Sequence, residues 1–286
     1  MKQFGRSHSA ISSLLRALDL DPDDTVAQST LIAMLTQKSD TDRIDASSRK
    51  HDLLAAGNLG EQCDQFDNLR GGQLIIGIGT GRSGSTSLVK FLQAQHGAFV
   101  SHERPPRLPW VPNTQRLKVH LRLFECLTAA YRLVGDVSHW WLPYLHYVFE
   151  TNPNVKVVAL QRDREQTITS FEKVKGFGED RSNHWYDHMG AGWRQNVWDE
   201  CYPSYAIKDR FEAIGHYWDA YYETVKEWSL RKPGQFFLAP THILNSREGQ
   251  DELLTFLGVS EPVYSSTKIR YNQGGSIADG VGIWSQ

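Results

Sequence analysis

The feature that most constrains the fold is an apolar run that ends in a loop of glycines and hydroxyls. Residues 74–78 read Leu-Ile-Ile-Gly-Ile, which is typical of a strand buried on both faces. Residues 79–87 read Gly-Thr-Gly-Arg-Ser-Gly-Ser-Thr-Ser, and the apolar residues that follow have helical spacing. This order of strand, glycine loop and helix predicts a phosphate site, because the first amides of such a helix bind anions.

Two well-known phosphate-binding patterns each fit part of this loop. Residues 79–86 have the spacing of a nucleotide-triphosphate loop, but Ser85 stands where that motif has its lysine for the β- and γ-phosphates. The three loop glycines also fit the dinucleotide-binding pattern, with Glu103 at about the place of its ribose-binding acid. The missing lysine argues against ordinary ATP or GTP hydrolysis. The loop therefore predicts phosphate binding and leaves the ligand open.

A second predicted strand ends at residues that suit another phosphate. Residues 155–160 form an apolar run broken only by Lys156, and Arg162 follows at the carboxyl end, where parallel sheets bind ligands. Ser170 lies about two turns into the next predicted helix. Arg162 and Ser170 can therefore converge on a second phosphate group.

Together the two motifs resemble the sulfotransferases that use 3′-phosphoadenosine 5′-phosphosulfate. In that family a basic-Ser-Gly-Thr/Ser-Thr core binds the 5′-phosphosulfate. The matching residues of this chain are Arg82, Ser83, Gly84, Ser85 and Thr86, with Ser87 adjoining them. An arginine followed eight residues later by a serine binds the 3′-phosphate in the family, as Arg162 and Ser170 would here. The arginine at position 82 is more similar to the Golgi-type and bacterial members than to the cytosolic ones.

The resemblance implies an α/β fold, with a P-loop-like parallel sheet flanked by helices, and a transferase. The sulfuryl group would pass in line from the donor to an acceptor hydroxyl, leaving adenosine 3′,5′-bisphosphate. Such a reaction requires positioned reactants, neutralisation of the leaving phosphate and removal of the acceptor's proton. Arg82 and the loop amides suit the leaving phosphate, and no metal is expected. The acceptor is a carbohydrate hydroxyl or another small molecule.

Glu103 is the first candidate for the general base. It follows residues 97–102, which read as a short strand ending at the same sheet edge, and its separation from Arg82 is similar to that in Golgi-type enzymes with a glutamate base. We expect partial burial to raise the pKa of Glu103, which would suit proton abstraction near neutral pH. The non-catalytic alternative is a surface glutamate paired with Arg104 or Arg107.

Two histidines are the alternative bases. Residues 117–121, Leu-Lys-Val-His-Leu, resemble the segment that holds the histidine base of cytosolic members, which makes His120 a candidate. His102 is the other candidate, because it adjoins Glu103. Lone histidines are more often structural or solvated than catalytic, so Glu103 comes first.

Two further segments resemble the family less closely. Residues 135–142 are similar to a Glu-Lys-Ser/Thr-Pro-x-Tyr segment, but Val137 replaces a lysine that helps to stabilise the transferring group. Substitutes for this lysine would be Lys118, Lys175 or Arg82. Near the C-terminus, residues 266–275 resemble the basic loop that closes over the nucleotide. The 3′-phosphate candidates in this loop are Lys268 and Arg270, for which a solvated surface pair is the alternative.

Composition limits the partners and the location. The formal net charge of −2 argues against general nucleic-acid binding. No apolar stretch approaches the length of a membrane span, and the N-terminus has no secretion signal. The cysteines have no spacing typical of disulfide pairing, so we expect a reducing, cytoplasmic location. These are Cys63, Cys126 and Cys201.

The first part of the chain reads differently from the rest. Residues 1–70 are predicted to form a helical region, in which residues 16–27 resemble one tetratricopeptide unit interrupted by Asp-Pro-Asp-Asp. One unit does not bury its own core, so we expect it to pack on the catalytic domain, on a second copy of the chain or on another partner. The sulfotransferase domain would then span residues 71–286.

Two other functions stay open at this level. A P-loop-type small-molecule kinase would need Mg²⁺ and a lysine after Gly84, which this chain lacks. A non-catalytic nucleotide-binding protein, with its N-terminal helices as a partner surface, would bind the bisphosphate and transfer nothing.

Overall fold

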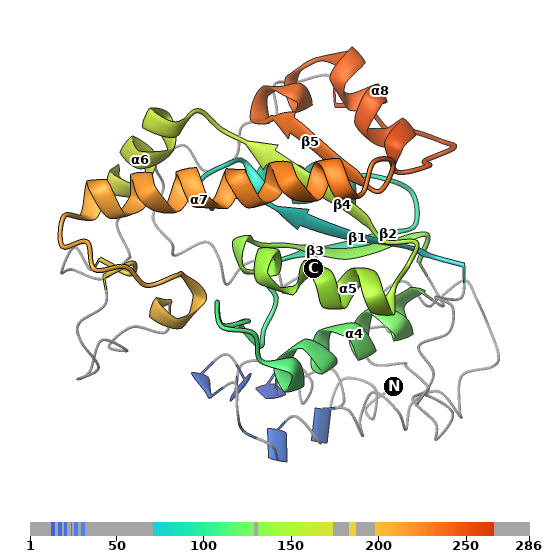
Figure 1. Ribbon diagram of the computed structural model, residues 1–286. Coiled ribbons are helices and arrows are strands. Elements are labelled where there is room, and N and C mark those ends of the chain that lie inside the picture. Colours follow the sequence, from blue (N-terminus) through green and yellow to red (C-terminus); the bar gives the residue numbers. More distant parts are fainter. Residues whose placement is uncertain are drawn as a thin grey trace.

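The computed structural model describes residues 71–128, 131–173, 183–186 and 198–265, and some positions between 13 and 31. The described region is built on a five-stranded parallel sheet with the order β2-β3-β1-β4-β5 (Figure 1). The strands are β1 (Gln73–Ile78), β2 (Ala98–His102), β3 (Leu133–Val137), β4 (Lys156–Gln161) and β5 (Phe236–Pro240). The predicted α/β fold with a parallel sheet is confirmed.

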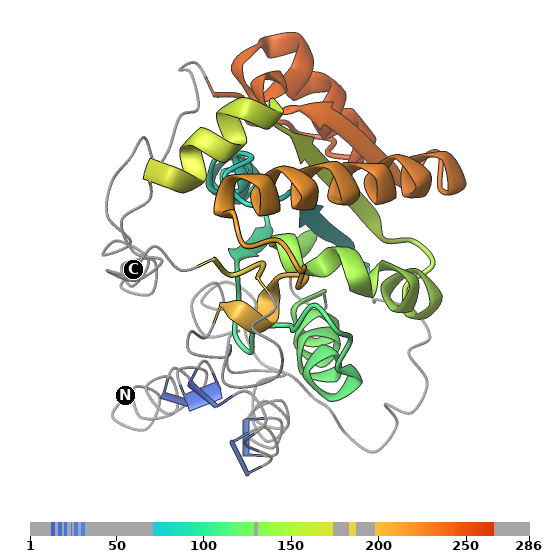
Figure 2. The ribbon, with the colours of Figure 1, turned by 60° about the vertical axis from the view of Figure 1, so that its left-hand side comes forward.

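Helices cover both faces of the sheet. They are α3 (Ser85–Gln93), α4 (Thr114–Thr128), α5 (Leu145–Thr151), α6 (Arg164–Lys173), α7 (Arg210–Arg231) and α8 (Arg247–Phe256). Three shorter 3₁₀ segments are η1 (His139–Tyr144), η2 (Asp199–Cys201) and η3 (Thr241–Asn245). The longest helix, α7, crosses one face of the sheet, as both views show (Figures 1 and 2).

The position of strand β1 in the sheet explains why its residues after Gln73 are apolar or glycine. Leu74, Ile76 and Ile78 belong to the buried cluster that also contains residues of α4, α5, α6 and α7. Ile75 belongs to a second cluster, formed with α3 and α8. Alternate residues of a strand face opposite sides of a sheet, so β1 buries both of its faces, as its sequence predicts.

The strand order places a ligand-binding edge at β1 and β4. From β1 the chain runs to β2 and back to β3, on one side of β1, and then crosses to β4 on the other side. The carboxyl ends of β1 and β4 therefore form the point at which the strand order reverses, where open parallel sheets bind ligands. The glycine loop follows β1, and Arg162 follows β4.

The described N-terminal residues are helical on both sides of a turn. Asp24 Oδ1 accepts hydrogen bonds from the amides of Val26 and Ala27, each at 2.9 Å, and so caps the second helical stretch. Leu18 and Leu31 are buried in the same cluster as residues of α4. These residues pack against the α/β domain; the tetratricopeptide resemblance itself stays a prediction. No helix among the described residues is both long and apolar enough to cross a membrane.

Candidate functional site

The glycine loop is held in shape by tyrosines of α7. The amide of Gly79 donates to the hydroxyl of Tyr221 at 3.0 Å, and the hydroxyl of Tyr217 donates to the carbonyl oxygen of Thr80 at 3.2 Å. A Cβ atom at Gly79 would collide with Ser83 Oγ, so this position requires glycine. The loop is therefore a rigid cradle between β1 and the first turn of α3.

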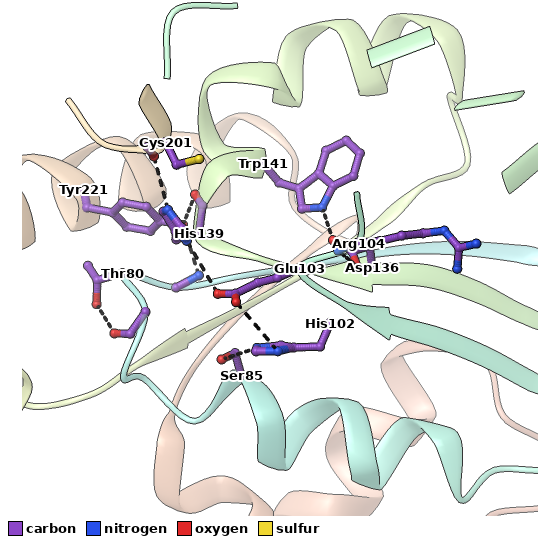
Figure 3. A network of polar contacts seen from close by, with 12 residues as sticks. Thr80, Ser85, His102, Glu103, Arg104, Asp136, His139, Trp141, Cys201 and Tyr221 are labelled. Atoms are coloured by element: carbon purple, nitrogen blue, oxygen red, sulfur yellow. Dashed lines mark hydrogen bonds and ion pairs between the residues drawn. The ribbon is translucent and has the colours of Figure 1, made fainter. Parts of the chain in front are cut away.

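Tyr221 also joins this loop to the chain after β3. Its hydroxyl accepts the hydrogen bond from Gly79 and donates one to the carbonyl oxygen of His139 at 3.1 Å (Figure 3). Tyr221 is buried, and burial raises the pKa of its hydroxyl well above the usual value. The group therefore stays protonated and keeps both hydrogen bonds.

Arg82, Arg162 and Ser170 meet at the sheet edge. Arg82 Nε donates to Ser170 Oγ at 3.2 Å, and Arg162 Nη1 donates to the carbonyl oxygen of Arg82 at 3.0 Å. Burial, and then the neighbouring charge of Arg162, lower the pKa of Arg82. Two guanidinium groups beside each other repel, and a bound anion would relieve that repulsion. The structure places all three residues together, while their binding roles stay a prediction.

Two side-chain-bearing residues have a left-handed backbone. Among the described residues, Arg82 at φ 55° and Glu103 at φ 50° are the non-glycine residues with positive φ. Such a conformation costs about 1–3 kcal/mol and clusters at functional sites. The two residues for which the sequence predicts catalytic roles are thus the two that carry this strain.

The Glu103 carboxylate lies between two imidazole rings (Figure 3). Its Oε2 is 4.0 Å from His102 Nδ1, and its Oε1 is 3.8 Å from His139 Nδ1. Burial acts to raise the pKa of Glu103, but His102, His139 and Arg107 outweigh it and lower this pKa to about 2. The expectation of a raised pKa is therefore wrong for the unliganded protein. The sequence does not show that His102, His139 and Arg107 gather around the carboxylate.

His102 connects Glu103 to the glycine loop. Its Nε2 lies 2.9 Å from Ser85 Oγ, at the first residue of α3. The structure thus brings this candidate base to the same sheet edge as Glu103, between Glu103 and the loop (Figure 3).

His139 was not singled out by the sequence. Its Nε2 donates to the carbonyl oxygen of Cys201 at 3.1 Å, and its ring stacks on that of Tyr202 with 4.3 Å between centroids. A signal was available, because His139 follows the carboxyl end of β3 within the segment 135–142. The contacts with Cys201 and Tyr202 depend on a distant part of the chain and have no local signature.

Asp136 holds the backbone next to Glu103. Its Oδ1 accepts from Ser101 Oγ at 2.8 Å and from the amide of Arg104 at 3.2 Å, and its Oδ2 accepts from Trp141 Nε1 at 2.8 Å. Arg104 is fully buried, and burial lowers its pKa to about 10 although Asp136 opposes this. Arg104 therefore interacts with Asp136, and the non-catalytic pairing of Glu103 with Arg104 is not what the structure shows.

His120 is part of the core. Its Nε2 donates to the carbonyl oxygen of Pro106 at 2.7 Å, and its ring packs against Trp141. Its side chain has no exposed surface, and burial, with a smaller contribution from Arg104, lowers its pKa to about 4. An acceptor cannot contact His120 in this structure, so its candidacy as base is wrong, and its role is structural.

Val137 stands where the family that the chain resembles has a lysine, and the one candidate lysine that the structure describes, Lys118, does not replace it. Val137 is buried, and its methyl groups occupy the space beside Gly77. Lys118 is exposed on α4. Arg82, the remaining candidate, lies in the loop itself, and its role as substitute stays a prediction. Three other candidates lie outside the described residues: Lys175, Lys268 and Arg270.

No family model and no curated protein sequence matches this chain. Among solved structures, a sulfotransferase from Alicyclobacillus acidocaldarius aligns with a TM-score of 0.44 and 16% identity, over 71% of this chain and 87% of that one. The sulfotransferase domain from the curacin biosynthetic pathway aligns with a TM-score of 0.43 and 15% identity, over 72% and 82%. Likeness of this degree does not assign the chain to a family.

Proposed function

We propose that this protein is a sulfotransferase that moves a sulfuryl group from 3′-phosphoadenosine 5′-phosphosulfate to an acceptor hydroxyl. The observation that carries the proposal is the hydrogen-bonded unit of Arg82, Arg162 and Ser170. It joins a glycine loop after one strand to a second anion-binding position after the neighbouring strand. A ligand with two separated phosphate groups fits such an edge better than a single triphosphate chain.

The donor would lie along this edge. The loop amides and hydroxyls would bind the 5′-phosphosulfate, since the first turn of α3 presents N–H groups and a positive dipole end to it. Those hydroxyls belong to Ser83, Ser85, Thr86 and Ser87. Arg162 and Ser170 would bind the 3′-phosphate. Serine in place of the triphosphate-loop lysine at position 85 agrees with a donor that has no γ-phosphate.

Glu103 would accept the acceptor's proton. The acceptor oxygen attacks sulfur, the bond between sulfur and the phosphate oxygen breaks, and its electron pair stays on the leaving phosphate beside Arg82. With its pKa at about 2, Glu103 is ionised at neutral pH in the unliganded protein. The negative donor raises that pKa on binding, which makes the carboxylate a stronger base at the moment of transfer. As acceptor we propose a carbohydrate hydroxyl.

Calorimetry tests the donor assignment first. Adenosine 3′,5′-bisphosphate should bind to the full chain without Mg²⁺ and more tightly than ATP does. Equal preference for ATP, or magnesium-dependent ATP turnover with a small-molecule acceptor, would instead support a kinase.

A transfer assay tests the reaction. Radiolabelled donor is incubated with sugar, phenol and aliphatic-alcohol acceptors, and labelled product is separated from donor. A labelled sugar is the expected product. Bisphosphate binding without transfer to any acceptor class would contradict the enzymatic assignment.

A further inference from the structure

His102 bridges the phosphate loop and the proposed base. Its Nε2 lies 2.9 Å from Ser85 Oγ, and its Nδ1 faces Glu103 Oε2 at 4.0 Å (Figure 3). A neutral imidazole suits both neighbours in the unliganded protein. Its Nδ1–H then points to the carboxylate, and its Nε2 accepts the hydroxyl proton of Ser85.

A phosphate bound at the loop takes the Ser85 hydroxyl proton away from His102 Nε2. Phosphate oxygens accept hydrogen bonds, and Ser85 has one hydroxyl proton to donate, so Ser85 Oγ becomes only an acceptor toward His102. Nε2 must then carry a proton. If the ring stayed neutral with its proton on Nε2, the lone pair of Nδ1 would face the Glu103 carboxylate and repel it. Only a doubly protonated imidazolium satisfies Ser85 and Glu103 together.

The charges of several neighbouring groups act on Glu103, and a bound donor changes their balance. Glu103 faces His139 from η1 at 3.8 Å, and the charges of Arg107 and of Arg82 on the loop act on it as well. A bound donor adds negative charge to the same site and opposes the ionisation of Glu103. A proton on His102 limits the rise in the pKa of Glu103, so that the carboxylate stays ionised.

We infer that His102 takes up a proton when a phosphate group occupies the loop, and thereby holds Glu103 ionised and in position. His102 is therefore a positioning residue: its protonation changes when the loop binds phosphate, and this change acts on Glu103. The identity of the ligand rests on the proposed function. The coupling itself applies to any phosphoryl ligand that hydrogen-bonds to Ser85.

Proton uptake is measured by titrating adenosine 3′,5′-bisphosphate into the full chain at pH 7.5, in two buffers of different ionisation enthalpy. At this pH the phosphate monoesters are already dianions, so the ligand itself contributes little. We expect the wild-type protein to take up a measurable fraction of a proton per ligand. His102→Gln keeps an amide near Ser85 but does not titrate, and its uptake should be close to zero. The control is His96→Gln, an exposed histidine after α3, with wild-type uptake.

Imidazole ¹⁵N NMR gives a second measurement, which observes the protonation of the histidine directly. One histidine of the wild-type protein should move to the doubly protonated form on binding, and this signal should be missing from His102→Gln. No uptake by the wild-type protein, or equal uptake by His102→Gln, would overturn the inference. If ATP, but not the bisphosphate, binds with His102-dependent uptake, the donor assignment fails and the coupling stands. If neither nucleotide binds, both proposals are wrong.

Discussion

Arg82 Nε donates a hydrogen bond to Ser170 Oγ, 3.2 Å away, and thereby ties the loop after β1 to the helix after β4. Arg162 completes the contact by donating to the Arg82 carbonyl oxygen at 3.0 Å. The two proposed phosphate positions are therefore parts of one hydrogen-bonded unit. Substitutions at either position should affect binding of a ligand that occupies both.

Arg162→Ala should weaken binding of adenosine 3′,5′-bisphosphate by about 10- to 100-fold, because a charge-assisted hydrogen bond contributes about 1.5–3 kcal/mol. Ser170→Ala should weaken it less, since it removes a neutral hydroxyl. Calorimetry measures both. Arg164→Ala is the matched control: Arg164 lies two residues after Arg162 and pairs with exposed Asp219 instead. Equal losses in Arg162→Ala and Arg164→Ala would contradict a specific site.

Glu103→Gln should lower kcat by about 10²- to 10⁴-fold, because it removes the proton acceptor and keeps the shape of the side chain. Bisphosphate affinity should stay within a few-fold of wild type. Steady-state transfer assays with the acceptor found by screening measure this split. Glu125→Gln is the control, since Glu125 is a glutamate of the same 28% side-chain exposure on α4. Near-normal turnover of Glu103→Gln would move the base to His102.

The stability that the ionised Glu103 gives the folded protein should fall as the pH is lowered. A carboxyl whose pKa falls to about 2 on folding, from an ordinary value near 4.5, stabilises the fold above pH ~4.5 and loses that contribution as pH falls toward 2. Wild type should therefore exceed Glu103→Gln in free energy of unfolding by about 1–3 kcal/mol at pH 6, and by less at pH 3. Urea unfolding at the two pH values measures the difference. A gap that grows in acid would contradict the lowered pKa.

Asp136→Asn should destabilise the protein strongly. The new amide would turn a donor toward Ser101, Arg104 or Trp141, each of which now donates to Asp136, and the buried Arg104 would lose its compensating charge. Breaking a buried charge pair costs about 3–5 kcal/mol. Urea unfolding at pH 7 checks this. In contrast, Asp219→Asn removes an exposed pair with Arg164 and should cost less than about 1 kcal/mol.

The sheet and its ligand-binding edge could be predicted because their causes are local. The run before Gly79 is apolar at every position but one glycine, which favours a strand buried on both faces, and Arg162 follows a second run broken only by Lys156. The strand before Arg162 is Lys156–Gln161, one residue later than the apolar run 155–160. The geometry of parallel strands predicted that Arg162 and Ser170 lie at this edge, whereas the direct contacts of Arg82 with both residues were not predicted.

The surroundings of Glu103 could not be predicted because they are assembled from distant segments. His139 reaches the carboxylate from η1 and is held by Cys201 and Tyr202, which return to the site through a separate part of the chain. Burial alone would raise the pKa of Glu103, but the neighbouring His102, His139 and Arg107 lower it, so the predicted direction of the shift was wrong. His120 failed as a candidate for a related reason: a short sequence likeness does not show which way a helix faces.

The Tyr221 hydroxyl gives the site a property that neither half would have alone. Because one group accepts from Gly79 and donates to His139, the loop and the segment beside Glu103 cannot move apart without losing at least one buried hydrogen bond. Donor and acceptor would therefore meet an arrangement already fixed before they arrive. The entropy of aligning the reacting groups is then lost during folding and not in each turnover. Intramolecular reactions gain much of their rate advantage in the same way.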